Sequence, residues 1–146
     1  MTSPIKQRLA AAYAAWHDSR GKTPMLLFEL MAEHIEIRSI LGASLSDHDL
    51  GRVYSGRAAA IEYYTAIAEG WEMISGGTEA LVEEGDRIVW VGRVGWRNHK
   101  TLRSFECPKV DVWAFADGKA ISYLEMLDSY GFAHAIGLID PPDQAD

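Results

Sequence analysis

The chain has 146 residues, of which 48% are hydrophobic and 24% are charged, a composition typical of one globular domain with a substantial core. Its formal net charge of −7 argues against a nucleic-acid or anionic-membrane partner, because both require a basic surface. No apolar run approaches a membrane span, the N-terminus lacks a signal-peptide layout, and one cysteine cannot form an internal disulfide. We therefore expect a single cytoplasmic domain over residues 1–146, with flexible ends at residues 1–4 and 140–146.

The first half of the chain has helical patterns. Residues 5–19 carry apolar side chains three and four positions apart, which predicts an amphipathic helix. Residues 23–31 predict a short second helix, because they open with threonine as an N-cap and proline in the first turn. Residues 35–40 alternate between apolar and polar as a strand does, and residues 57–71 predict a third helix.

The second half of the chain has strand patterns. Residues 78–83, 87–97 and 102–107 are rich in β-branched and aromatic side chains and are separated by turn residues. A hairpin over residues 110–127 follows. Helices first and strands afterwards indicate an α+β domain, with the helices packed on one face of the sheet.

The hairpin carries two acids where a core strand would carry apolar residues. Its strands are residues 110–115 and 120–127, with turn residues Asp117 and Gly118 between them, and the acids are Asp111 and Glu125.

The turn decides whether these acids share a face. A two-residue loop would pair Phe115 with Ala120 and place the acids on opposite faces. A three-residue loop with Gly118 in the left-handed conformation pairs Phe115 with Lys119 and makes the acids diagonal neighbours on one face. We favour the three-residue loop, because its third position prefers glycine.

On this register one face is an apolar wall with two acids, as in the floor of a small-molecule pocket. Its residues are Asp111, Trp113, Phe115, Ile121, Tyr123, Glu125 and Leu127.

The opposite face would carry two tryptophans and would be a large exposed apolar patch. Its residues would be Trp90, Val94, Trp96, Ser122, Leu124 and Met126. We expect a second copy of the chain to cover this face, which makes the protein a homodimer.

Five segments, taken in order and spacing, resemble the NTF2-like superfamily, and within it the SnoaL-like and ketosteroid-isomerase-like branch. They are residues 30–38, 55–59, 84–89, 111–119 and 125–128. The resemblance implies a cone with three N-terminal helices packed on a curved antiparallel or mixed sheet.

The resemblance also implies roles for single residues. Tyr13 and Asp111 fall at the positions of the tyrosine and the protonated aspartic acid that form the oxyanion hole of ketosteroid isomerases, and Ser39 stands at the position of their base. Arg93 and Glu125 match the arginine and one acid of limonene-epoxide-hydrolase-like members, whose second acid is replaced by Gly95. SnoaL-like cyclases use a pocket acid, which Asp111 could supply.

The residues themselves favour similar roles. A carboxyl beside Trp113 and Phe115 is pushed toward its neutral form, so Asp111 could donate a hydrogen bond to a developing oxyanion. Glu125 is expected to pair with Arg93 or Arg97. His17 is expected to be exposed.

We therefore expect a small-molecule pocket protein that acts as a cofactor-free isomerase, cyclase or hydrolase on a hydrophobic organic substrate. The expected catalytic residues are Asp111, Tyr13, Glu125 and Arg93, and the expected ligand-binding residues are Trp16, Ser39, Trp113, Phe115 and Tyr123. No metal or cofactor is expected. The alternatives are a non-catalytic binding protein and a protein-interaction module that uses the sheet face.

Overall fold

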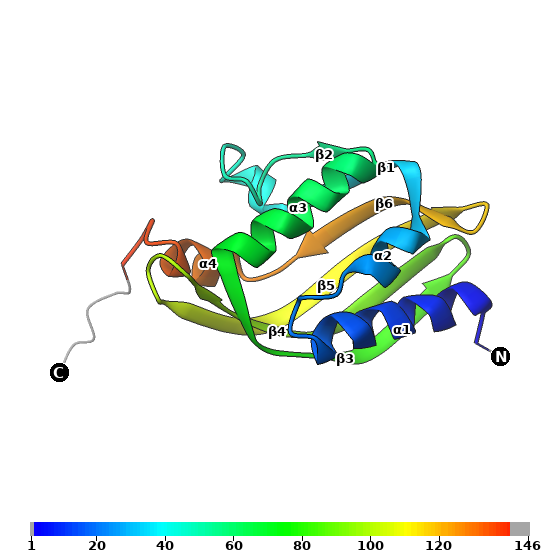
Figure 1. Cartoon of the computed structure of the whole chain (residues 1–146), viewed down its shortest axis with the longest axis horizontal. Coiled ribbons are helices and arrows are strands. Elements are labelled where there is room, and N and C mark those ends of the chain that lie inside the picture. The colour runs from blue at the N-terminus through cyan, green and yellow to red at the C-terminus, as the bar shows by residue number, and fades with distance from the viewer. Residues whose placement is uncertain (1, 141–146) are drawn as a thin grey trace.

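A computed structural model describes residues 2–140 and shows helices packed against one curved sheet (Figure 1). The elements of this part of the chain are α1 (Pro4–Asp18), α2 (Met25–Leu30), β1 (Met31–Ser39), the 3-10 helix η1 (Ile40–Ala43), β2 (Tyr54–Ser55), α3 (Arg57–Gly70), β3 (Trp71–Glu84), β4 (Arg87–Asn98), β5 (Ser104–Ala116), β6 (Lys119–Met126) and α4 (Ser129–Ala135).

The sheet has the strand order β2-β1-β6-β5-β4-β3. β1 runs parallel to β6, and the other neighbours are antiparallel. In Figure 1, α1, α2 and α3 lie in front of the strands. This arrangement confirms the predicted α+β class with a mixed sheet. The C-terminal helix α4 was not predicted.

The N-terminal helix is fixed by its own first residues. The Ser3 hydroxyl accepts a hydrogen bond from the Lys6 amide at 3.1 Å, and Pro4 occupies the first turn. At the other end of the described chain, Arg103 pairs with Asp140 at 3.2 Å. The expected flexibility of the two ends stays a prediction. Residues 1 and 141–146, which belong to the same expectation, lie outside the described residues.

The hairpin between β5 and β6 differs from the favoured register. Ala116 pairs with Lys119 and Phe115 with Ala120, so the loop has two residues, and the expected three-residue loop is wrong. Both loop residues have positive φ, 51° at Asp117 and 77° at Gly118, which suits the twist of a tight hairpin.

A bulge beyond the turn restores the alignment of the acids. The register shifts between Ala114 and Phe115, because β6 contains one extra residue there. Asp111 consequently lies directly opposite Glu125. The prediction that the acids share a face is confirmed, but the bulge and not the turn produces it.

Strand β4 has the opposite orientation to the predicted one. Trp90 is fully buried and Val94 is 4% exposed, and both line the cavity under the helices together with Trp96. Arg93 points to the outer face and is exposed. The expected patch of two tryptophans on the outer face is therefore wrong.

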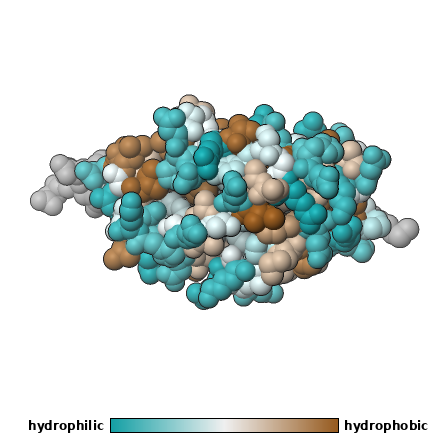
Figure 2. Space-filling view, turned by 45° about the horizontal axis from the view of Figure 1, so that its top comes forward, coloured by the Kyte–Doolittle hydropathy of each residue, from teal (hydrophilic) through white to brown (hydrophobic). Residues whose placement is uncertain are grey.

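The outer face of the sheet is nevertheless apolar at its centre. It carries Val82, Val89, Val91, Val110, Val112, Leu124 and Met126, which are half-buried or exposed. On the side turned forward in Figure 2, hydrophobic residues instead form separate patches among polar ones.

Candidate functional site

A cavity of about 60 Å³ lies between the helices and the sheet. Its walls are mostly aromatic, with Tyr13, Trp16, Tyr63, Tyr64, Trp71, Trp90, Trp96, Phe105, Tyr123 and Phe132. Three charged side chains also line it, Lys109, Asp111 and Glu125. An apolar cavity with a few convergent polar groups is the usual form of a small-molecule site.

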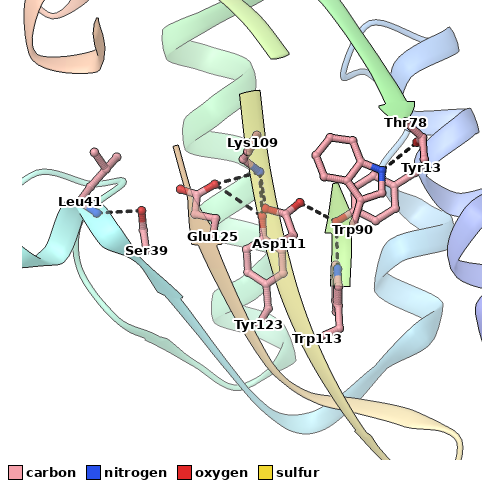
Figure 3. A network of polar contacts seen from close by, with 10 residues as sticks. All are labelled: Tyr13, Ser39, Leu41, Thr78, Trp90, Lys109, Asp111, Trp113, Tyr123 and Glu125. Carbon is pink, nitrogen blue, oxygen red and sulfur yellow. Dashed lines mark hydrogen bonds and ion pairs between the residues drawn. The ribbon is translucent and has the colours of Figure 1, made fainter. Parts of the chain in front are cut away.

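The three charged groups form one buried cluster on β5 and β6 (Figure 3). The Lys109 ammonium lies 2.8 Å from Asp111 Oδ1 and 3.2 Å from Glu125 Oε2, and it donates to the Tyr123 hydroxyl at 3.1 Å. Asp111 and Glu125 are only 1% and 6% exposed. One cation between two anions leaves the cluster with a net charge of −1.

A directional chain of hydrogen bonds reaches Asp111 from α1. The indole of Trp113 can only donate, and it donates to the Tyr13 hydroxyl at 2.9 Å. Tyr13 therefore donates its own proton to Asp111 Oδ2, at 2.5 Å. Both oxygens of Asp111 thus accept hydrogen bonds, from Lys109 and Tyr13, whereas Asp111 was expected to donate one.

Burial and neighbouring charges shift the pKa values of the cavity groups. Burial, and then the Asp111 carboxylate, raise the pKa of Tyr13 well above its ordinary value of 10.0. Burial also raises the pKa values of Tyr63, Tyr64 and Tyr123, with smaller contributions from the carboxylates. Burial alone would lower the pKa of Lys109, but Asp111 and Glu125 raise it above its ordinary value of 10.5. The lysine is therefore a cation and the phenols are neutral.

The sequence reasoning did not identify Lys109. It follows Pro108, where the strand was expected to be interrupted, but β5 continues through the proline. Alternate residues of a strand share a face, so Lys109 lies on the same side as Asp111 and Trp113. This alternation was the signal that could have identified it.

The other predicted site residues divide between the cavity and its surroundings. Trp16 and Tyr123 line the cavity. Trp113 and Phe115 are buried outside its wall. The Ser39 hydroxyl accepts from the Leu41 amide at 3.1 Å and starts η1 (Figure 3), although Ser39 pairs with Glu125 across β1 and β6.

Arg93 does not meet Glu125, and the expected pairing of Glu125 with Arg93 or Arg97 is wrong. Arg93 lies on the outer face, and Arg97 lies 3.8 Å from Glu72. Lys109 takes the place that was expected for an arginine.

His17 lies one turn after Tyr13 and lines the cavity, although it was expected to be exposed. Its ring is half-buried, 5.6 Å from the Trp90 ring and 6.0 Å from the Tyr13 ring. Burial and then the nearby Lys109 lower the pKa of His17, partly opposed by Asp18.

Between residues 2 and 140 no group of three or more histidine, cysteine, aspartate or glutamate side chains could hold a metal ion. Within the same stretch, no helix is both long and apolar enough to cross a membrane.

Solved structures resemble this fold over nearly its whole length. An NTF2-like protein of unknown function from Burkholderia pseudomallei is 20% identical with a TM-score of 0.77, covering 92% of this chain and 98% of its own. A protein classed as a SnoaL-like polyketide cyclase from Jannaschia is 19% identical with a TM-score of 0.70, covering 97% of this chain and 99% of its own.

A third structure, from Catenulispora acidiphila, has a ketosteroid-isomerase-like fold and was solved with trimethylamine. It is 16% identical with a TM-score of 0.69, covering 100% of both chains. No protein-family model and no curated protein sequence matches this chain. The described strand order, the helices on one face and these three structures agree: the chain has the NTF2-like fold, the architecture of the SnoaL-like and ketosteroid-isomerase-like proteins.

Proposed function

We propose that the protein catalyses a cofactor-free proton transfer on a small, hydrophobic organic substrate, with Glu125 as the general base. The observation that carries this proposal is the open oxygen of Glu125. Its Oε2 is held by Lys109 at 3.2 Å and by Tyr123 at 3.5 Å. No hydrogen bond at ordinary distance from a described residue reaches Oε1; the Tyr63 hydroxyl is the remaining hydrogen-bonding neighbour of this carboxylate, and both residues line the cavity.

Asp111 is less suited to this role. Its two oxygens are occupied by Lys109 and Tyr13. Asp111 therefore positions Lys109 and Tyr13, and the remaining carboxylate faces the substrate.

Lys109 supplies the electrostatic part of the reaction. When Glu125 Oε1 takes a proton from a carbon next to a carbonyl, the electron pair of the C–H bond moves toward the carbonyl oxygen. Negative charge thus moves from Glu125 to the substrate beside the buried ammonium, which stabilises it without a change in net charge. Return of the proton from Glu125 to another carbon completes an isomerisation.

A small unsaturated ketone tests this proposal. We expect the protein to isomerise cyclohex-3-enone to the conjugated cyclohex-2-enone, followed by ultraviolet absorbance. Glu125→Gln should lower the rate by about 100-fold to 10,000-fold, because the amide cannot accept the proton. Glu84→Gln, an exposed change at the end of β3, is the matched control and should leave the rate unchanged. Equal rates for the two variants would contradict the role of Glu125.

A second candidate function is the binding of small organic ammonium ions without chemistry. The net charge of −1 in an aromatic cavity supports it, because aromatic faces attract cations and an uncompensated buried charge is costly. The trimethylamine in the Catenulispora structure is a ligand of this chemical type.

Choline and its uncharged isostere 3,3-dimethylbutan-1-ol separate this function from the first. Calorimetry should show tighter binding of choline than of the alcohol. Glu125→Gln should lower the affinity for choline and leave the affinity for the alcohol unchanged. Equal affinity for the two compounds in the native protein would argue against an ammonium site.

We also propose that the outer face of the sheet pairs with a second copy of the chain. Its valines and Leu124 form an apolar centre over β4, β5 and β6. Charged side chains surround this centre, among them Glu84, Arg93, Arg97 and Glu106. An apolar centre with a polar rim is the usual anatomy of a protein interface.

Sedimentation velocity tests this pairing. We expect a dimer at micromolar concentration and a monomer for Val91→Glu, because the added charge would be buried at the centre of the interface. Ile61→Glu, at a 45% exposed position on α3, is the control and should remain dimeric. A native protein that sediments as a monomer would remove the proposal.

A further inference from the structure

The loop at residues 44–53, between η1 and β2, closes one end of the cavity. Leu50 in this loop is 7% exposed and lines the cavity, as does Phe132 of α4. In Figure 1 the loop and α4 lie at the same end of the molecule. Movement of the loop away from α4 would therefore open the cavity at this end.

One residue, His48, holds the loop together. Its ring nitrogen Nδ1 accepts a hydrogen bond from the Leu50 amide at 3.0 Å. Its backbone amide donates to the Leu45 carbonyl at 3.0 Å, and its carbonyl accepts from the Gly51 amide at 2.8 Å. Because Nδ1 accepts, the proton of the neutral ring lies on Nε2.

The same ring connects the loop to α4. It meets the ring of Phe132 edge-on, with 5.1 Å between the centroids. Leu50 and Phe132, the two residues that the His48 ring contacts, both line the cavity. His48 thus joins two parts of the cavity wall from behind.

Glycine makes the closed form of the loop possible. A Cβ at Gly51 would collide with the Leu45 carbonyl oxygen, and a Cβ at Gly42 would lie 2.7 Å from the Gly51 carbonyl oxygen. A side chain at either position would force these backbone segments apart. Gly51→Ala therefore provides a form of the protein in which the loop cannot close.

Protonation of His48 removes its hydrogen bond to Leu50. Both ring nitrogens of an imidazolium are donors, so the Nδ1 proton would face the Leu50 amide proton. Burial lowers the pKa of His48 below its ordinary value of 6.5, and Asp49 partly opposes this shift. As the pH falls below 6.5, an open loop takes up a proton at His48 that the closed loop does not, so acid favours the open loop.

The charges around the His48 ring come from its own loop and from α4. The other ionisable side chains of these two segments and of the α4 N-cap are Asp47, Asp49, Arg52, Asp128, Tyr130 and His134. Asp49 is the one among them that shifts the pKa of His48, and it lies 3.7 Å from Arg52. Histidine is the side chain that ordinarily changes charge between pH 5 and 8, so an experiment must separate His48 from His134.

We propose that His48 is a pH-sensitive switch for access to the cavity. Its neutral ring holds the loop at residues 44–53 closed, and its protonation in mild acid lets the loop open, so that a ligand enters or leaves. The ligand is the small organic molecule of the proposed function, on which this part of the inference rests. The movement of the loop itself requires no ligand.

Hydrogen–deuterium exchange of the loop amides at pH 7 and pH 5, corrected for intrinsic exchange rates, tests the switch. In the native protein, exchange across residues 44–53 should be about 3-fold to 30-fold faster at pH 5. The upper bound is about 1 + 10^1.5, the proton uptake at pH 5 of a free histidine with a pKa of 6.5. Exchange in the centre of β5 should stay constant, which separates loop opening from global unfolding.

Three variants identify the responsible group. His48→Asn keeps an acceptor for the Leu50 amide, because asparagine accepts from the amide two residues onward, but it cannot be protonated. Its loop exchange should agree within twofold at the two pH values. His134→Asn is the control on α4 and should keep the native response, whereas Gly51→Ala should exchange rapidly at both pH values.

Acrylamide quenching of tryptophan fluorescence shows whether the open loop exposes the cavity. Trp71 lines the cavity and stacks on Phe132, with 5.2 Å between the ring centroids. Quenching should increase from pH 7 to pH 5 in the native protein and stay constant in His48→Asn.

Two results would overturn the switch. One is native loop exchange that agrees within twofold at pH 7 and pH 5, and the other is an acid response in His48→Asn equal to that of the native protein. Neither measurement uses a substrate. A protein that isomerises no ketone but opens its loop in acid would refute the proposed reaction alone, and an active protein with a pH-independent loop would refute the switch alone.

Discussion

Replacing Lys109 by methionine tests the charged cluster directly. The side chain keeps its length, but the ammonium that separates Asp111 from Glu125 is lost, and two buried carboxylates then face each other. Removing one partner of a buried ion pair costs about 3 to 5 kcal/mol, a large part of the roughly 5 to 15 kcal/mol that stabilises a domain. At about 4 °C per kcal/mol, the melting temperature should fall by about 12 to 20 °C.

Urea unfolding followed by tryptophan fluorescence measures this loss at pH 7. Lys119→Met is the matched control, because the Lys119 ammonium is exposed and, among the described residues, donates only to the Glu29 carbonyl. Its cost should not exceed about 1 kcal/mol.

A double variant and pH provide two internal checks. Glu125→Gln added to Lys109→Met removes one of the facing charges and should restore part of the lost stability. Lowering the pH to 5 should also raise the stability of Lys109→Met relative to that of the native protein, because one of the facing carboxylates can then take up a proton. A Lys109→Met protein within about 1 kcal/mol of native at pH 7 would refute the buried cation between two anions.

Two further results follow from burial and close contact. The folded protein should lose stability as the pH rises above 10, because four buried tyrosines keep protons that the unfolded chain releases: Tyr13, Tyr63, Tyr64 and Tyr123. Each tyrosine should lower the free energy of unfolding by up to about 1.4 kcal/mol per pH unit. Urea unfolding between pH 8 and 11 measures this loss. Gly92→Ala should destabilise by about 1 to 3 kcal/mol, because its Cβ would lie 2.3 Å from the Gly77 carbonyl and 2.4 Å from the Trp90 ring, whereas Gly77→Ala meets open space and should cost less in the same assay. An unchanged stability at pH 11, or equal effects of the two alanines, would contradict these packing arguments.

The fold was predictable from the sequence because its signals are local. The amphipathic spacing of α1 and the run of strands after α3 are each contained in short windows. The common face of Asp111 and Glu125 was also predicted, but from a three-residue loop that the hairpin does not have; the bulge in β6 produces it.

The details that failed depend on contacts between segments. The orientation of β4 is set by its pairing with β5, where Trp90 lies opposite Asp111, and a one-residue slip reverses every side chain. The pairing of Lys109 with Glu125 depends in the same way on the register of β5 against β6.

Because of the bulge in β6, the orientation of the two acids in the cavity does not depend on the conformation of the hairpin tip. The tip at Asp117 and Gly118 could lengthen or change its turn type, and the acids would keep their orientation as long as the extra residue stayed between them and the loop. If the bulge were straightened and Ile121 paired with Ala114, Leu124 would instead lie opposite Asp111 and Glu125 would turn to the outer surface, because side chains alternate along a strand. The orientation of Glu125 therefore depends on how β6 accommodates Ile121 and not on the length of the hairpin tip.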